Sequence, residues 1–368
     1  MRYSNDERIV FTLDAGGTNY VFTAMKGCKR IGGQITLPAE AADLDKSIAN
    51  IKRGFEGLAK SVGAKPAAIS FAFPGPADYE RGVIFNMGNI PAFAGGVALA
   101  DILRDSFGVP VFINNDGDLF AYGEAMAGAL PAVNALLEGQ GNPRRCRNLF
   151  GVTLGTGLGG GFVVDGRLYT GDNSNAAEIW LMKNKFNAES FAEEAACIRA
   201  IQKGYARRIG LADYKKYSPK DIEFIALGKM EGDARAAAEA YAEMGEALGD
   251  VFCEIARIAD CAIVIGGGLS YGHRLFMPSL IAEMNSQVKN TGGKPFPKLV
   301  QKVYNLEDAA QAKAFASGGT REVKVYGSEK TVVSNFEKRI GVCVSKLGAS
   351  NAVAVGAYAF ALNKLDEK

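Results

Sequence analysis

The amino-acid sequence predicts an α/β protein of two similar lobes with a cleft between them. Its 368 residues are enough for two domains with a large buried core. Each half also opens in the same way, with an apolar strand, a glycine turn and a second strand, at residues 8–25 and 148–164. Helical patterns follow both openings, as expected when helices cover a sheet.

The elements of the first half follow from periodicity and from glycine and proline punctuation. Apolar runs and turn signals predict a three-stranded β-meander followed by further strands, and residues 43–62 repeat apolar side chains at helical spacing. We expect strands at 8–13, 20–25, 31–37, 67–73 and 109–114, and helices at 43–62 and 118–128.

The second half repeats this order with longer helices. Strands are expected at 148–154, 160–164 and 261–265, and helices at 188–207, 233–259, 274–289 and 350–363. Ser350 is the expected N-cap of the last helix. Residues 290–346 are polar and β-prone, and we expect an insertion there. The predicted lobes are residues 1–125 together with the C-terminal helix 350–368, and residues 126–349.

Composition excludes several classes of protein. The formal net charge of +2 gives no reason to expect a nucleic-acid partner. The sequence contains no run of about 18 apolar residues, so no membrane span is expected. The polar N-terminus also lacks an apolar signal core, and we therefore expect a cytoplasmic protein. The six cysteines form no CxxC pair and are expected to be reduced. His273 is the only histidine, which argues against a zinc site or a Ser-His-Asp triad.

Glycine is abundant, with 45 residues against about 26 at average usage. The excess gathers in three clusters, each beside a strand. In the first cluster, residues 14–18, glycine backbone can approach a phosphate closely, and the Asp14 carboxylate could hold Mg²⁺ through water. An ordinary β-hairpin explains this cluster equally well.

The second cluster, residues 154–161, formally satisfies a GxGxxG pattern. That dinucleotide fingerprint requires a helix next, whereas a strand and a hairpin follow here, so we reject it. A P-loop is excluded because no GK[ST] is present. A glycine hairpin with a threonine hydroxyl remains, which suits a nucleotide phosphate. The third cluster, residues 265–269, predicts either close contact with a base or ribose, or a simple turn from strand to helix.

Asp116 follows a buried strand, and no lysine or arginine lies near it in sequence. Such a carboxylate can take a proton from a hydroxyl that attacks a phosphoryl group. It can equally cap the following helix, a role that Asp118 could also fill.

Taken together, these motifs resemble the ROK family of bacterial sugar kinases, which share an actin-like, ribonuclease-H-type fold. Residues 14–18 resemble its DxGGT motif, 73–76 its PGP turn, 89–93 its N-L-P-x-W segment, 115–124 its NDANxxAxGE motif, 154–161 its LGTGxGGG run, 265–270 its GGGLS motif, and 347–356 its closing segment. The resemblance therefore implies two ribonuclease-H-like lobes around a cleft.

The resemblance also implies a role for individual residues. Asp116 would be the general base. Sugar-binding residues would be Gly75, Asn89, Asn115, Asp116 and Glu178. Nucleotide-binding residues would be Asp14, Gly16, Gly17, Thr18, Gly155, Thr156, Gly157, Gly267 and Gly268, with Gly267 and Gly268 facing the adenosine.

The chain departs from the family after Glu178. Trp180-Leu181 stands where the family has Gly-His, and the cysteine-rich zinc loop is missing, because residues 183–196 contain no cysteine. We therefore expect no zinc and one lost sugar contact. Glu193 or Glu194 could replace the family's second sugar-binding glutamate. Trp180 is expected either in the core or stacked on a sugar.

The sequence therefore predicts MgATP-dependent phosphorylation of a hexose or an N-acylhexosamine. A sugar sensor without catalysis and a kinase for a non-sugar molecule remain as alternatives. The expected partners are a small sugar and, by family resemblance, a second copy of the chain, without nucleic acid or membrane.

Overall fold

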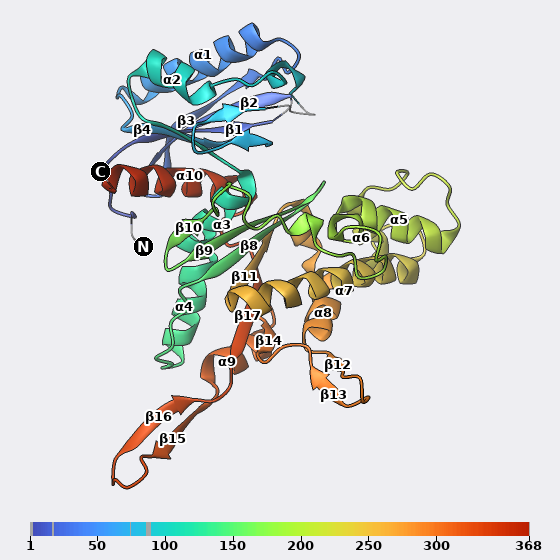
Figure 1. Ribbon diagram of the computed structural model, residues 1–368. Coiled ribbons are helices and arrows are strands. Elements are labelled where there is room, and N and C mark those ends of the chain that lie inside the picture. The colour runs from blue at the N-terminus through green and yellow to red at the C-terminus, as the bar shows by residue number, and fades with distance from the viewer. Residues whose placement is uncertain (1–2, 17, 74, 86–89, 368) are drawn as a thin grey trace. The chain divides into compact units, whose positions relative to one another are not determined.

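The computed structural model of the chain describes residues 3–16, 18–73, 75–85 and 90–367 (Figure 1). By internal contacts the chain divides into two compact units. The first unit comprises residues 1–131, 160–177 and 345–368, and the second comprises residues 132–159 and 178–344. Helix α4 (Ala129–Gly139) and strand β9 (Leu158–Val164) each run from one unit into the other.

A five-stranded sheet in the order β3-β2-β1-β4-β7 forms the centre of the first unit. Its strands are β1 (Val10–Ala15), β2 (Asn19–Lys26), β3 (Lys29–Pro38), β4 (Ala68–Ala72) and β7 (Val111–Asn114). The first three form the predicted antiparallel meander, and β4 and β7 join parallel to β1. The unit also contains β5 (Ala77–Asp78), β6 (Val83–Ile84), β10 (Arg167–Tyr169) and the short 3-10 helix η1 (Pro91–Phe93).

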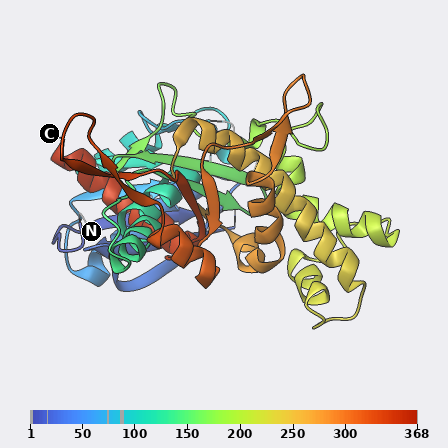
Figure 2. The same ribbon diagram turned by 90° about the horizontal axis from the view of Figure 1, so that it is seen from below.

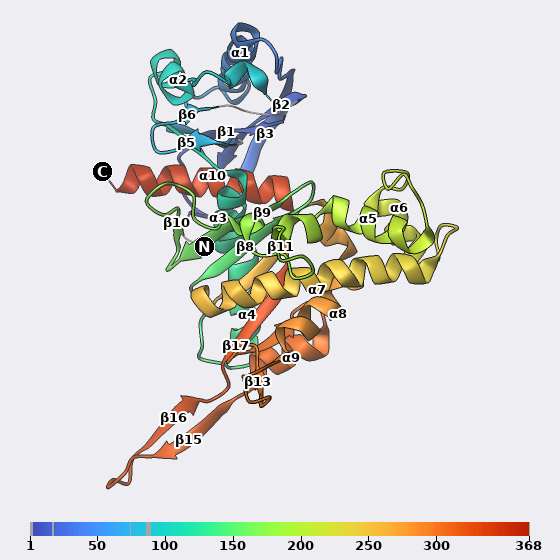
Figure 3. The same ribbon diagram turned by 45° about the vertical axis from the view of Figure 1, so that its right-hand side comes forward.

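Helices cover both faces of this sheet, as Figures 1 and 3 show. The helices of the unit are α1 (Leu44–Val62), α2 (Leu99–Phe107), α3 (Asp116–Ala127) and α10 (Ala349–Asp366). Buried aromatic side chains, among them Phe11, Phe22 and Phe55, fill the space between the sheet and α1. On the other side α10 packs against α3, and Gly123 and Gly356 let the two helix backbones approach, since a Cβ atom at either glycine would collide with a carbonyl oxygen of the other helix.

The second unit is built on the parallel strands β8 (Leu149–Leu154), β11 (Ala262–Gly266), β17 (Arg339–Val344) and β14 (Lys302–Asn305), which neighbour one another in that order. Its helices are α5 (Ile198–Ile209), α6 (Pro219–Ala226), α7 (Ala234–Ala259), α8 (His273–Met284) and α9 (Ala309–Ser317), with short 3-10 helices η2 (Ile179–Leu181), η3 (Ala192–Ala195) and η4 (Gly268–Gly272). Figure 2 shows α7 lying alongside α5 and α6.

Two hairpins complete the second unit, β12 (Gln287–Lys289) with β13 (Pro295–Pro297), and β15 (Thr320–Lys324) with β16 (Thr331–Asn335). The second hairpin projects from the unit (Figures 1 and 3). Throughout the described residues, each helix is too short or too polar to cross a membrane.

The α/β class is confirmed, but three expectations fail in detail. The insertion expected at 290–346 contains β14 and β17, which pair in the main sheet, so only its hairpins and α9 are excursions. The helix expected over 188–207 begins only at Ile198, because the preceding residues form turns and η3. Ser350 does not cap the last helix. Gly348 holds that position with a φ of 78°, a conformation that favours glycine.

Candidate active site

Acidic side chains gather at one edge of the first sheet. Strands β1, β4 and β7 run parallel, and their register aligns Asp14 with Ala72 and Ala72 with Asn114. All three strands therefore end at the same edge. Asp14 lies at the end of β1, and Asn115-Asp116 directly follows β7. Residues that are about 100 positions apart in sequence thus come together where parallel sheets commonly bind ligands.

Asp116 is the first residue of α3, and Asn115 is the N-cap. The Gly117 N–H donates to Asn115 Oδ1 at 2.7 Å and to Asp116 Oδ1 at 2.9 Å. The helix cap that the sequence suggested at Asp116 or Asp118 is therefore wrong, because Asn115 caps α3. The amide nitrogen of Asn115 donates to no other described residue, so it is available to a ligand.

The Asp116 carboxylate is exposed to solvent, yet protein atoms crowd around it and limit its hydration. Desolvation raises the pKa of Asp116, and hydrogen bonds from the backbone N–H groups of Gly117 and of Asp116 itself oppose this shift only in part. A carboxylate with a raised pKa that water can still reach is suited to accept a proton.

Asp14 has a similar environment. Desolvation raises its pKa, and repulsion from the Asp116 carboxylate adds to the increase, while Arg30 acts in the opposite direction. The two carboxylates therefore influence each other across the end of β4. A cation bound at Asp14 would relieve this repulsion.

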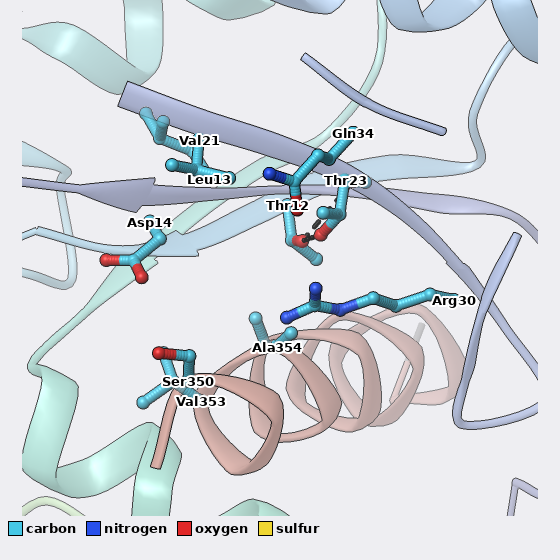
Figure 4. Close-up of a pocket in the computed structure, with 11 residues that line it drawn as sticks. Thr12, Leu13, Asp14, Val21, Thr23, Arg30, Gln34, Ser350, Val353 and Ala354 are labelled. Carbon is cyan, nitrogen blue, oxygen red and sulfur yellow. Dashed lines mark hydrogen bonds between the residues drawn. The ribbon is translucent and has the colours of Figure 1, made fainter. Parts of the chain in front are cut away.

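A cavity of about 290 Å³ adjoins Asp14 on the face of the sheet toward α10. Figure 4 shows Asp14 at one end, with Ser350 of α10 on the same side, and the Arg30 guanidinium toward the other end. The hydroxyls of Thr12 and Thr23 lie 2.7 Å apart on its wall. Of the predicted site residues that the structure describes, only Asp14 lines this cavity.

The remaining predicted residues of the first unit lie in loops at the same edge. Gly16 N–H donates to Asn19 O at 3.1 Å and closes the loop between β1 and β2, which also carries Thr18. Gly75 follows β4, and a Cβ atom there would lie 2.9 Å from the hydroxyl of Tyr79. Gly17 and Asn89 fall outside the described residues.

The end of the second glycine cluster packs against the start of α3. A Cβ atom on Gly117 would lie 2.5 Å from Gly160 O, and one on Gly161 would lie 2.5 Å from Gly117 O. Both glycines are therefore required for β9 to approach the helix that carries Asp116. In the sequence these glycines are recognisable only as members of motifs, and their packing role appears only in the structure.

The second unit brings the other two parts of the glycine pattern together. Strands β8 and β11 are parallel, with Gly266 aligned to Thr153, so the turn after β8 and the turn after β11 share an edge. Gly267 has a φ of 85°, and a Cβ atom there would collide with the carbonyl oxygen of Leu154. Beside Gly155 and Gly268 the space is open. Bare backbone is thus accessible on both turns.

The turn after β8 has free hydrogen-bond donors. The Gly155 N–H closes the turn on Gly157 O at 3.0 Å. Within the described part of the chain, the N–H groups of Thr156 and Gly157 donate no hydrogen bond. The Thr156 side chain is exposed. Successive unpaired N–H groups in a glycine turn form an anion-binding concavity.

Glu178 is held by the tryptophan that departs from the family pattern. The indole Nε1–H of Trp180 donates to Glu178 Oε2. The half-buried indole ring in turn packs edge-to-face on Phe191, with ring centres 5.6 Å apart. Trp180 is therefore half-buried rather than a core residue, and its indole N–H binds the Glu178 carboxylate.

The carboxylates of Glu193 and Glu194 are already engaged. Glu193 accepts hydrogen bonds from the Leu158 N–H and from Arg199, and Glu194 pairs with Arg199 and Lys203. Sequence reasoning missed this network, because it joins residues 35 positions apart. Nowhere in the described ranges do three or more His, Cys, Asp or Glu side chains gather in a way that could hold a metal ion.

Comparison with known proteins places the chain among sugar kinases. The ROK family model matches residues 10–314. The crystal structure of a glucokinase from Parabacteroides distasonis is 47% identical, covers 99% of both chains and superposes with a TM-score of 0.90. An N-acetyl-D-glucosamine kinase from Vibrio cholerae is 26% identical over 84% of this chain and 97% of its own length.

A more distant structure shows the fold alone. It is a ROK family glucokinase from Streptomyces griseus in complex with glucose and AMPPNP, 17% identical, with a TM-score of 0.60 over 95% of this chain and 98% of its own. The predicted fold class is confirmed by this likeness, and the family model spans most of the sequence. The chain belongs to the ROK family.

Proposed function

We propose that this protein transfers the γ-phosphoryl group of ATP to a hydroxyl of a hexose or an N-acylhexosamine, with Asp116 as the general base. The observation that carries the proposal is the Asp116 carboxylate, accessible to solvent, raised in pKa and fixed at the carboxyl edge of the first sheet. The 47% identical relative, described as a glucokinase, supports the choice of a sugar as acceptor.

The chain's own groups account for the proton transfer. Asp116 accepts the proton of the attacking sugar hydroxyl as the bond to phosphorus forms, and its raised pKa makes it a stronger base than an ordinary aspartate. The helix cap through Asn115 fixes the Asp116 backbone, and the free Asn115 amide can donate to another sugar hydroxyl.

The nucleotide binds through backbone groups in this proposal. Phosphate oxygens accept hydrogen bonds from the turns that contain Gly16, Gly17 and Thr18, and Gly155, Thr156 and Gly157. Gly267 and Gly268 face the adenosine. The unpaired N–H groups of Thr156 and Gly157 and the open space beside Gly155 and Gly268 suit these roles.

The donors present also fit a magnesium ion. Mg²⁺ prefers carboxylate and water oxygens, and the Asp14 carboxylate is exposed to solvent at the strand end, where another negative charge already disfavours its ionisation. Asp14 would hold the ion through water. When bound, the ion supplies charge neutralisation for the phosphates.

Glu178 is the proposed sugar ligand of the second unit. Because the Trp180 indole N–H already binds one of its oxygens, the other is left to accept a sugar hydroxyl. We also propose that the two units act as the kinase lobes, that no zinc takes part, and that the protein works in the cytoplasm as a homodimer.

The test is an ADP-release assay with MgATP over a panel of hexoses, N-acylhexosamines and non-sugar alcohols, with the Asp116→Asn variant as matched blank. We expect sugar-dependent ADP release by the wild-type chain that exceeds the blank by at least about 10²-fold. Release only with non-sugar alcohols would shift the function to another kinase. Sugar binding without any ADP release would instead indicate a sensor.

A further inference from the structure

Residues 193–199 make three hydrogen bonds to the turn that follows β8. The Ile198 N–H, at the start of α5, donates to Gly155 O at 2.9 Å. Arg199 donates from Nη1 to Thr156 O at 3.1 Å. Glu193 Oε2 accepts from the Leu158 N–H at 3.0 Å. Two carbonyl oxygens and one N–H of the turn are thereby satisfied from one segment.

Gly157 makes room for this fastening. A Cβ atom on Gly157 would lie 2.5 Å from Glu193 Oε2, so a side chain at this position would displace the carboxylate. The glycine therefore serves the contact with Glu193 as well as the conformation of the turn. The carbonyl oxygens of Gly155 and Thr156 accept hydrogen bonds from Ile198 and Arg199, which fixes the orientation of these two residues. The Thr156 N–H remains unpaired among the described residues.

This arrangement creates an electrostatic problem for an anion-binding turn. The Glu193 carboxylate is only partly exposed, with 21% of its side chain accessible, so water screens its charge incompletely. Unneutralised, it would repel the phosphates of a nucleotide. Arg199 Nη2 lies 2.9 Å from Glu193 Oε1 and compensates the charge at close range. The hydrogen bond to Glu193, followed by one to Glu194, raises the pKa of Arg199.

We infer that Glu193 and Arg199 are a positioning pair that shapes the turn of residues 155–158 for the nucleotide phosphates. Arg199 also cancels the negative charge that Glu193 brings to that turn. The inference rests on the proposed function, because it takes the turn to be a phosphate site. It assigns neither residue to direct contact with sugar or nucleotide.

The chain offers a matched control next to Glu193. Glu194 also pairs with Arg199, at 3.0 Å, and with Lys203 at 2.9 Å, but it makes no hydrogen bond to the turn. Replacing Glu194 removes an equal charge from the same ion-pair network, so it reports on general damage to the start of α5.

The experiment measures binding of a non-hydrolysable ATP analogue by calorimetry, together with kcat and both KM values, for Glu193→Gln, Arg199→Ala, their double variant and Glu194→Gln. We expect Arg199→Ala to weaken analogue binding at least about tenfold, since a charged hydrogen bond is lost and a carboxylate is left uncompensated. Analogue affinity of Glu194→Gln and the KM for sugar of every variant should stay within about twofold of wild type.

The affinity of the double variant for the ATP analogue, compared with that of Arg199→Ala, decides the inference. Removing the charge of Glu193 in the Arg199→Ala background should restore at least about threefold of the lost affinity, because the repulsion disappears with the charge. A double variant no better than Arg199→Ala overturns the inference. So does an equal loss in Glu193→Gln and Glu194→Gln, or a rise confined to the sugar KM. Thermal unfolding of each variant separates misfolding from these outcomes.

Failure of the proposed function has a different signature. A folded wild-type chain that does not bind the ATP analogue contradicts the phosphate site, and the inference falls with it. If the wild-type chain instead binds the analogue while the double variant is no better than Arg199→Ala, the proposed function stands. Only the positioning pair is then contradicted.

Discussion

The carboxyl edges of the two sheets are built from opposite chemistry. The edge of the first sheet carries Asp14 and Asp116, two solvent-exposed carboxylates with raised pKa values. The edge of the second sheet carries glycine turns at 155–157 and 267–268 and presents backbone N–H groups. The first edge is suited to handle protons and cations, and the second is suited to accept anions.

The two edges also differ in how they are held. Asp116 depends on its own helix start, through Asn115 and Gly117. The turn after β8 depends on the distant segment that contains Glu193 and Arg199. A carboxylate on a helix terminus is positioned by local structure, whereas a glycine turn has little structure of its own and needs outside contacts.

The largest expected effect is the loss of stability on replacing Gly267 at the second edge. Gly267→Ala should lower the free energy of unfolding of the second unit by about 3 kcal/mol, because a left-handed residue becomes strained and its Cβ meets the Leu154 carbonyl. The measurement is urea unfolding followed by the fluorescence of Trp180, the only tryptophan in the chain. Gly268→Ala is the control, since open space lies beside Gly268. Equal midpoints for both variants would contradict the close approach.

A smaller effect, the pH dependence of kcat/KM, tests the role of Asp116 at the first edge. A base must be deprotonated, so kcat/KM should fall about tenfold for each pH unit below the pKa of Asp116. Since desolvation raises that pKa above its ordinary value of 3.8, the acid limb should lie above pH 3.8. The residual activity of Asp116→Asn should lack this limb. An identical limb in that variant would assign the titration to another group.

The smallest effect concerns the residue that departs from the family pattern. Trp180→Phe keeps an aromatic ring against Phe191 but loses the N–H that binds Glu178. The KM for sugar should rise about three- to tenfold, the cost of one hydrogen bond to a charged group, while affinity for the ATP analogue stays unchanged. An unchanged sugar KM would argue against Glu178 as a sugar ligand.

Much of the structure of both sheet edges was predictable from the sequence, since strands flanked by glycine and aspartate leave a strong local signal. The β1–β2 hairpin, the strand before Asp116 and the glycine turns after β8 and β11 lie where the pattern predicts them. Buried parallel strands are short, apolar and sharply bounded, which is why these elements could be recognised.

Features that depend on tertiary structure were not predictable. Strands β14 and β17 are separated by a helix and a hairpin, so no local pattern marks them as neighbours in a sheet. Ser350 is an acceptable N-cap by residue type, but the N-cap is Gly348, two residues earlier, which has a positive φ. Glu193 carries no sequence sign of its contact with Leu158, which only folding creates.

The most direct test of the central claim separates turnover from nucleotide binding in Asp116→Asn. At saturating sugar and MgATP, kcat should fall by at least about 10²-fold, while affinity for a non-hydrolysable ATP analogue stays within about twofold of wild type. That result would assign proton transfer to the first edge and leave anion binding intact. A kcat close to wild type would contradict Asp116 as the general base.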